Sequence, residues 1–314
     1  MTLAPDAQAF VDMMASAPGP LHSLGVDGAR EAVRQLAALN PPPQQVFSVQ
    51  DREIPGPAGP IPIRVYRPSD ETGCPILVYF HGGGWTIGNL DTVDPLCRAL
   101  SAQANCVVVS VDYRLAPENP FPAAVDDGYA AVEWTAAHAD QIGGDPERIA
   151  VGGDSAGANI STSLCILSRD NNGPKIVYQL LAYPATEHCV ERPSWVEHAE
   201  APVLTAADVT WFWSQYLRSE ADRCDPRATP ANAESLAGLP PALIITAEVD
   251  PIRDDGEHYG ELLRTAGVDV TVARYPGTFH GFFTMVGMIG QADTAVLDAT
   301  ERLKQAFAQA HSER

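Results

Sequence analysis

From residue 75 onward, short apolar runs alternate with segments of helical period, and this alternation constrains the fold of the chain more than any other feature. Strands that are apolar along their whole length and separated by helices indicate a parallel sheet covered on both faces. The sequence therefore predicts an α/β fold. Strands are expected at 76–80, 107–111, 149–151, 176–181, 242–246 and 268–275, and helices at about 92–104, 123–139, 156–169, 254–266 and 291–310.

Two regions do not follow the alternation. Before it, residues 5–17 and 26–39 are predicted to be helices, and strands at 46–54 and 61–66 are expected to form an antiparallel hairpin with a long Pro/Gly loop. Within it, residues 185–238 contain no obvious strand but do contain the aromatic helical segment TAADVTWFWSQYL. An insertion of that size between two strands is expected to form a separate lid over the sheet edge.

The charge balance excludes several classes of partner. The chain has 314 residues, with 40 acidic against 20 basic residues and a net charge of −20, so binding to nucleic acid or to an anionic membrane surface is not expected. No run of 18 apolar residues occurs, which argues against membrane insertion, and the N-terminus lacks the basic region of a secretory signal. Hydrophobic residues make up 45% of the chain, as in ordinary globular proteins.

The cysteines indicate a reducing compartment. Six are present, none in a Cys-x-x-Cys arrangement, and this density is far below that of a disulfide scaffold. We expect them to be reduced and mostly buried, and we expect the protein to be cytoplasmic.

The segment Gly153-Asp154-Ser155-Ala156-Gly157 lies between a predicted strand and a predicted helix. A serine nucleophile needs a tight turn that exposes its hydroxyl, and glycines two residues before and after it let strand and helix approach each other. The alternative is a glycine-rich loop that cradles phosphate, but the spacing matches neither a dinucleotide nor a Walker motif. Ser155 is therefore the candidate nucleophile.

A second glycine cluster, His81-Gly82-Gly83-Gly84-Trp85, directly follows the strand at 76–80. The backbone N–H groups of Gly82, Gly83 and Gly84, with that of Ala156, are candidates to stabilise an oxyanion. His81 is expected to bond the loop backbone rather than to act as a base.

A serine hydrolase of this kind needs an acid and a base that follow the nucleophile in the chain. His280 is the candidate base because it follows the last strand, where α/β sheets present functional groups. Asp250 is the candidate acid, just past the strand 242–246, with Glu248 as its rival on the same side of the strand. Asp250 could also be a turn residue before Pro251.

These motifs, taken together and in order, resemble the hormone-sensitive-lipase-like family of bacterial esterases within the α/β-hydrolase fold. The matching segments between about 75 and 285 are HGGGW at 81–85, DYRLAPE at 112–118, FPAA at 121–124, GDSAG at 153–157, DPIRD at 250–254 and HGF at 280–282.

The resemblance implies a Ser155–His280–Asp250 triad and an oxyanion hole from Gly83, Gly84 and Ala156. It implies hydrolysis of short- to medium-chain acyl esters through an acyl-enzyme, without a cofactor. It also implies a catalytic core of residues 45–184 and 239–314 under a helical cap of residues 1–44 and 185–238. The enzyme is expected to be a monomer or a homodimer.

Other interpretations stay open at this stage. Trp85, Trp211 and Trp213 are candidates for substrate contact. Phe212 and Tyr216 belong to the same aromatic cluster as Trp211 and Trp213 and could also line an acyl pocket, although such a cluster is more often cap core. No metal site is expected, because the acidic pairs at 126–127 and 254–255 lie at helix starts without a histidine ligand. An amidase or lactonase could use the same triad, and a catalytically silent fold could serve as a binding module.

Overall fold

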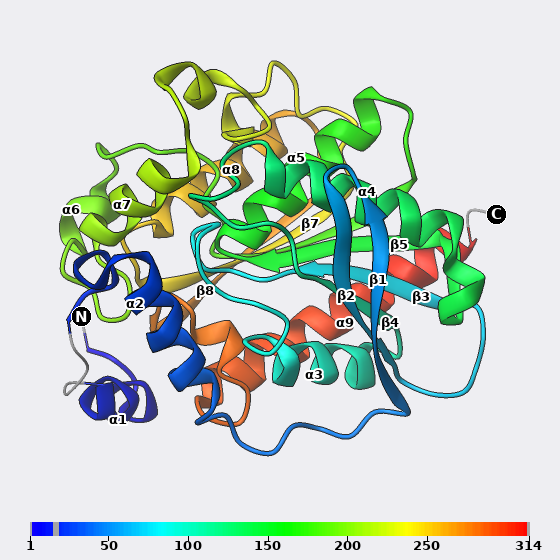
Figure 1. The fold of residues 1–314 in the computed structure, drawn as a ribbon, viewed down its shortest axis with the longest axis horizontal. Coiled ribbons are helices and arrows are strands. Elements are labelled where there is room, and N and C mark those ends of the chain that lie inside the picture. The colour runs from blue at the N-terminus through cyan, green and yellow to red at the C-terminus, as the bar shows by residue number, and fades with distance from the viewer. Residues whose placement is uncertain (1, 15–18, 313–314) are drawn as a thin grey trace.

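An eight-stranded sheet forms the centre of the protein, in a computed structural model that describes residues 2–14 and 19–312 (Figure 1). The strand order is β1-β2-β4-β3-β5-β6-β7-β8; β2 runs antiparallel to β1 and β4, and the other neighbours pair in parallel. The predicted mostly parallel α/β sheet is confirmed. The strands are β1 Ser48–Gly56, β2 Gly59–Arg67, β3 Cys74–Phe80, β4 Val107–Val111, β5 Gly144–Asp154, β6 Ile176–Ala182, β7 Ala242–Val249 and β8 Val270–Phe279.

Helices cover both faces of this sheet. They are α3 Asp94–Ala104, α4 Ala123–Ala137, α5 Ala156–Asp170, α8 Arg253–Thr265 and α9 Gly290–Ser312, each within two residues of its predicted ends. Alternate residues of β3 divide between the faces: Ile76 and Val78 belong to the same apolar cluster as α4, α5 and α8, whereas Leu77 belongs to that of α3 and α9. Both faces are therefore buried, which explains the continuous apolar strands.

The hairpin between β1 and β2 differs from the prediction of a long loop. Gly56 pairs with Gly59, so only Pro57 and Ala58 form the turn. Gly59 has a φ of 137°, a conformation that glycine adopts readily. The prolines and glycines at 55–60 suggested a loop, but both strands continue into this segment, where Pro55 pairs with Pro60.

The N-terminal region forms α1 (Pro5–Met14) and α2 (Leu21–Ala37), and residues 15–17 of the first predicted helix lie outside the described residues. The second helix begins earlier than predicted, with a kink at Gly25 where φ is 66°. A backbone hydrogen bond connects the start of α1 to β8, since the Ala4 N–H donates to the Gly277 carbonyl over 2.9 Å.

Residues 185–238, all of which the structure describes, contain no strand. They form α6 (Pro193–Glu197), α7 (Ala206–Tyr216) and two short 3₁₀ turns, at Glu220–Cys224 and Pro230–Asn232. Thr205 and Asp208 begin α7 with a capping box, in which side chain and backbone bond reciprocally. The backbone N–H and Nδ1 of His22, on α2, both lie 2.8 Å from Asp208 Oδ1, so the N-terminal helices and the insertion contact each other.

Candidate active site

Ser155 lies in the turn between β5 and α5, with φ of 54° and ψ of −117°. Its neighbours leave no room for side chains: a Cβ on Gly157 would lie 1.9 Å from the Phe80 carbonyl oxygen, and one on Gly153 would lie 2.4 Å from the Gly157 carbonyl carbon. The two glycines therefore permit the close approach of strand and helix that exposes the serine hydroxyl.

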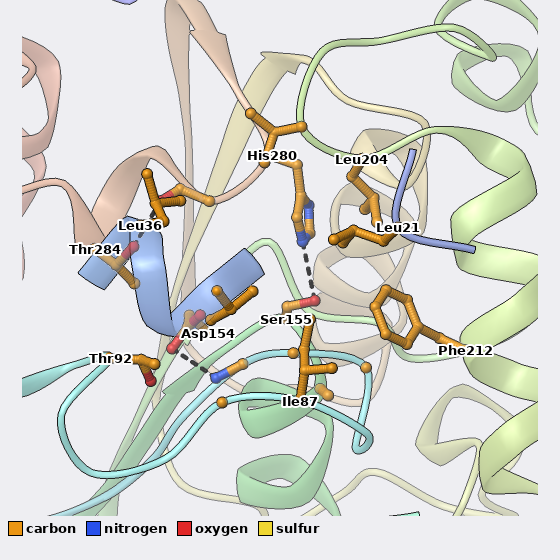
Figure 2. A pocket seen from close by; sticks show the side chains of 18 of the residues that line it. Leu21, Leu36, Ile87, Thr92, Asp154, Ser155, Leu204, Phe212, His280 and Thr284 are labelled. Atoms are coloured by element: carbon orange, nitrogen blue, oxygen red, sulfur yellow. Dashed lines mark hydrogen bonds between the residues drawn. The ribbon is translucent and has the colours of Figure 1, made fainter. Parts of the chain in front are cut away.

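Three side chains form a continuous hydrogen-bonded chain at this turn. His280 Nδ1 lies 2.7 Å from Asp250 Oδ2, and His280 Nε2 lies 2.9 Å from Ser155 Oγ (Figure 2 shows the second bond). An ionised carboxylate only accepts hydrogen bonds, so we assign the imidazole proton to Nδ1, which leaves the lone pair of Nε2 toward the serine hydroxyl. Asp250 is fully buried and His280 is 7% exposed.

Asp250 and its rival Glu248 have separate partners. Asp250 Oδ1 accepts from the Ile252 N–H over 2.9 Å, which holds the carboxylate beside His280. Glu248 Oε2 instead accepts from the Gly277 N–H over 2.7 Å, in β8. The chain leaves β7 after Val249, so strand parity no longer keeps the two carboxylates on one side.

The loop at 81–85 follows β3 and lies beside Ser155. Gly83, Gly84 and Ala156 all line the same pocket as the serine. Gly82 differs, because its N–H donates to Asp154 Oδ1 over 3.0 Å. We therefore remove Gly82 from the candidate oxyanion donors, since its only backbone proton already has an acceptor.

His81 has the structural position expected of it. Its Nδ1 lies 2.7 Å from the Gly82 carbonyl oxygen, which can only accept, so Nδ1 carries the proton. The ring stacks on Tyr113 with centroids 4.4 Å apart. Burial lowers the pKa of His81 to about 4, so the ring stays neutral and fixes the loop.

The pocket above Ser155 is a cavity of about 190 Å³. Leu21 and Leu36 of α2 and Phe212 of α7 line it (Figure 2). Val209 of α7 also belongs to the lining. Most of the lining is apolar, so the pocket suits a hydrocarbon group better than a strongly charged one.

The three tryptophans do not all reach this pocket. Trp85 and Trp213 belong to its lining, with their rings 4.5 Å apart. Trp211 does not line it, whereas Phe212, the next residue of the same aromatic cluster, does. Three consecutive side chains of a helix cannot all face one pocket, and the packing of α7 decides that Phe212 and Trp213 do so and Trp211 does not.

Three of the four acidic residues at the helix starts have protein partners. Asp127 Oδ1 accepts from Arg114 over 2.8 Å, Asp254 Oδ2 accepts from the Ser194 N–H over 2.8 Å, and Asp255 Oδ2 accepts from the Thr186 N–H over 3.0 Å. Within the described ranges, no three His, Cys, Asp or Glu side chains gather in a way that could hold a metal ion. No helix among the described residues has the length and apolar character required to span a membrane.

Comparison with known proteins identifies the family. A family model described as alpha/beta hydrolase fold matches residues 77–284. Carboxylic ester hydrolase LipN of Mycobacterium tuberculosis is 48% identical, with 85% of this chain and 75% of the relative covered, and carboxylesterase NlhH of the same species is 43% identical, with 92% of each covered. The chain belongs to the hormone-sensitive-lipase-like family of α/β-hydrolase-fold esterases.

A solved member of this esterase family has nearly the same backbone. The hyperthermophilic esterase from the archaeon Pyrobaculum calidifontis is 40% identical, with a TM-score of 0.92 over 97% of this chain and 99% of that one. The expected fold, family and enzyme class are confirmed, and the chain is a carboxylesterase-type hydrolase.

Proposed function

We propose that this esterase cleaves short- to medium-chain acyl esters by acyl transfer to Ser155, with His280 as the base and Asp250 as the acid. The observation that carries this proposal is the hydrogen-bonded chain from Asp250 Oδ2 through His280 to Ser155 Oγ, at the pocket floor. It supplies an activated nucleophile where an ester can be enclosed.

The reaction proceeds in two steps. Ser155 Oγ attacks the ester carbonyl while its proton moves to His280 Nε2, and the imidazolium then protonates the departing alkoxide. Water attacks the acyl-enzyme by the same route and releases the acid. The buried Asp250 carboxylate holds the Nδ1 proton and stabilises the imidazolium in both steps.

The oxyanion formed in each step is stabilised by the N–H groups of Gly83, Gly84 and Ala156. Gly84 has a φ of 54°, and a Cβ there would lie 2.1 Å from the Phe212 ring. The absence of a side chain at this position lets the loop approach both the substrate and α7. Backbone donors held in this way need no reorganisation when the charge develops.

A helical cap of residues 1–44 and 185–238 over a core of residues 45–184 and 239–314 sets the acyl-length preference. The pocket receives apolar side chains from α2 and from α7, which supports this division. Each buried methylene adds at most about 0.8 kcal/mol, or roughly fourfold in kcat/KM, until the acyl chain meets the wall.

The site needs no second subunit, because Ser155, Asp250 and His280 come from one chain. The enzyme therefore acts as a monomer or a homodimer. All six cysteines are free, four of them buried, and this supports a reducing compartment such as the cytoplasm.

The test is kcat/KM for soluble p-nitrophenyl esters of graded acyl length. Activity should rise over the short chains and fall beyond a medium length. Phe212→Ala should move the maximum to longer chains, because Phe212 lines the pocket, whereas Phe47→Ala should leave it unchanged, because that ring is 56% exposed elsewhere. A preference for long chains, with a jump in rate above the solubility limit, would contradict the proposal.

A further inference from the structure

Asp154 precedes the nucleophile and is a buried carboxylate in the pocket lining, with 6% of its surface exposed. Its Oδ1 accepts two hydrogen bonds, from the Tyr79 hydroxyl over 2.9 Å and from the Gly82 N–H over 3.0 Å. Within the described part of the chain, no donor reaches Oδ2. One oxygen therefore holds the loop at 81–85, and the other has unused acceptor capacity.

Asp154 Oδ2 is not among the fully buried side-chain atoms that lack a partner, so this oxygen is open to the pocket. Burial raises the pKa of Asp154 to about 6, so the group is mainly ionised at neutral pH. The acyl-transfer mechanism does not use it, because His280 is the group that contacts Ser155 Oγ. A donor on a bound molecule would take the place of water at Oδ2.

The pocket is also asymmetric about Ser155. In Figure 2, Asp154, Thr92, Thr284 and Leu36 lie to one side of the Ser155–His280 bond, and Leu21, Leu204 and Phe212 lie to the other. Apart from Ser155 and His280, the polar side chains labelled there all lie on the side with Asp154.

The two threonines on that side have already used their protons. Thr92 Oγ1 donates to the Asn89 carbonyl over 2.6 Å, and Thr284 Oγ1 donates to the Gly281 carbonyl over 2.9 Å. Thr92 Oγ1 also accepts from the Asn89 N–H over 3.2 Å, so neither hydroxyl has a proton left for a bound molecule. Asp154 Oδ2 is therefore the acceptor available on this side, and it matches a substrate group that donates.

We propose that Asp154 is a specificity-determining residue whose Oδ2 accepts a hydrogen bond from a hydroxyl or protonated amine on the substrate. The preferred substrates are then esters that carry such a donor close to the ester bond, with an apolar group on the Leu204 and Phe212 side. This inference rests on the proposed role of Ser155 and adds the substrate class.

The experiment uses two pairs of esters in which a hydroxyl replaces a methyl group of similar size. One pair is 2-hydroxyethyl butyrate and propyl butyrate, with the donor in the alcohol. The other is ethyl 3-hydroxybutyrate and ethyl 3-methylbutyrate, with the donor in the acyl group. The readout is the ratio of kcat/KM, hydroxyl over methyl, measured by proton release for the full-length enzyme and its variants.

Asp154→Asn is the informative substitution. Its amide oxygen can still accept from Gly82 and Tyr79, while its NH₂ group replaces the acceptor Oδ2 with a donor. A hydrogen bond to a charged group is strong, so the ratio should fall about 10- to 100-fold in at least one pair. A disturbed loop would slow both members of a pair equally and would leave the ratio unchanged.

Asp126→Asn is the matched control, because it removes one exposed carboxylate outside the pocket around Ser155, and its ratio should equal that of the unaltered enzyme. A change of less than threefold for Asp154→Asn in both pairs would overturn the inference. If the acyl-transfer proposal itself failed, the outcome would differ, since neither member of a pair would be cleaved or Ser155→Ala would retain full activity.

Discussion

Asp250→Asn tests the hydrogen-bonded chain most directly. Asp250 Oδ1 accepts from the Ile252 N–H over 2.9 Å, so the amide oxygen of the variant should take this position. Its NH₂ group then faces His280 Nδ1 and donates to it. The imidazole proton must move to Nε2, which points at Ser155 Oγ and can no longer accept the serine proton.

The expected loss in kcat is about 10⁴-fold, which corresponds to about 5 kcal/mol of transition-state stabilisation. Glu248→Gln is the matched control, since it makes the same change two residues away. The new amide oxygen can still accept from the Gly277 N–H, so kcat should stay within about threefold.

The assay is initial-rate hydrolysis of p-nitrophenyl butyrate by each purified variant, with thermal unfolding to confirm that both are folded. Labelling by an organophosphate should slow in parallel with kcat for Asp250→Asn. If Glu248→Gln lost more activity than Asp250→Asn, Glu248 would be the acid, and the reasoning from the 2.7 Å contact of Asp250 with His280 would be refuted.

The remaining predictions concern the nucleophile, the loop and pH. Ser155→Ala should lower kcat for ester hydrolysis by about 10⁴- to 10⁶-fold with an unchanged unfolding midpoint, and near-normal turnover would refute its role. Gly84→Ala should lower kcat about 10²- to 10³-fold, because its Cβ would lie 2.1 Å from the Phe212 ring, and adding Phe212→Ala should restore part of the rate. The folded-state pKa of Asp154, about 6, exceeds its unfolded value of 3.8, so its contribution lowers the free energy of unfolding as pH rises from about 4 to 6. Urea titrations over this range should show that the free energy of unfolding falls less, or rises more, with pH in Asp154→Asn than in the unaltered enzyme. An equal dependence on pH would contradict the raised pKa of Asp154.

The alternation of strands and helices was predictable because each element is specified by neighbouring residues. Val107–Val111 was predicted with its observed ends, since a short run with four β-branched valines in five residues favours a strand buried on both faces. Ser155 and His280 were also visible as candidates, because each lies where a strand ends and short motifs mark both places. The turn at Pro57 was missed because proline suggests a loop where the strands in fact continue.

Only the tertiary structure decided which atoms meet. Ser155 and His280 are 125 positions apart, and their 2.9 Å contact depends on how β5 and β8 are placed in the sheet. The sequence by itself determined the elements and the chemical groups, because hydrophobic period and glycine spacing act locally. It did not show that the Gly82 N–H belongs to Asp154 or that Phe212 rather than Trp211 lines the pocket. Long-range packing decides which acceptor the Gly82 N–H meets and which residues of α7 face the pocket.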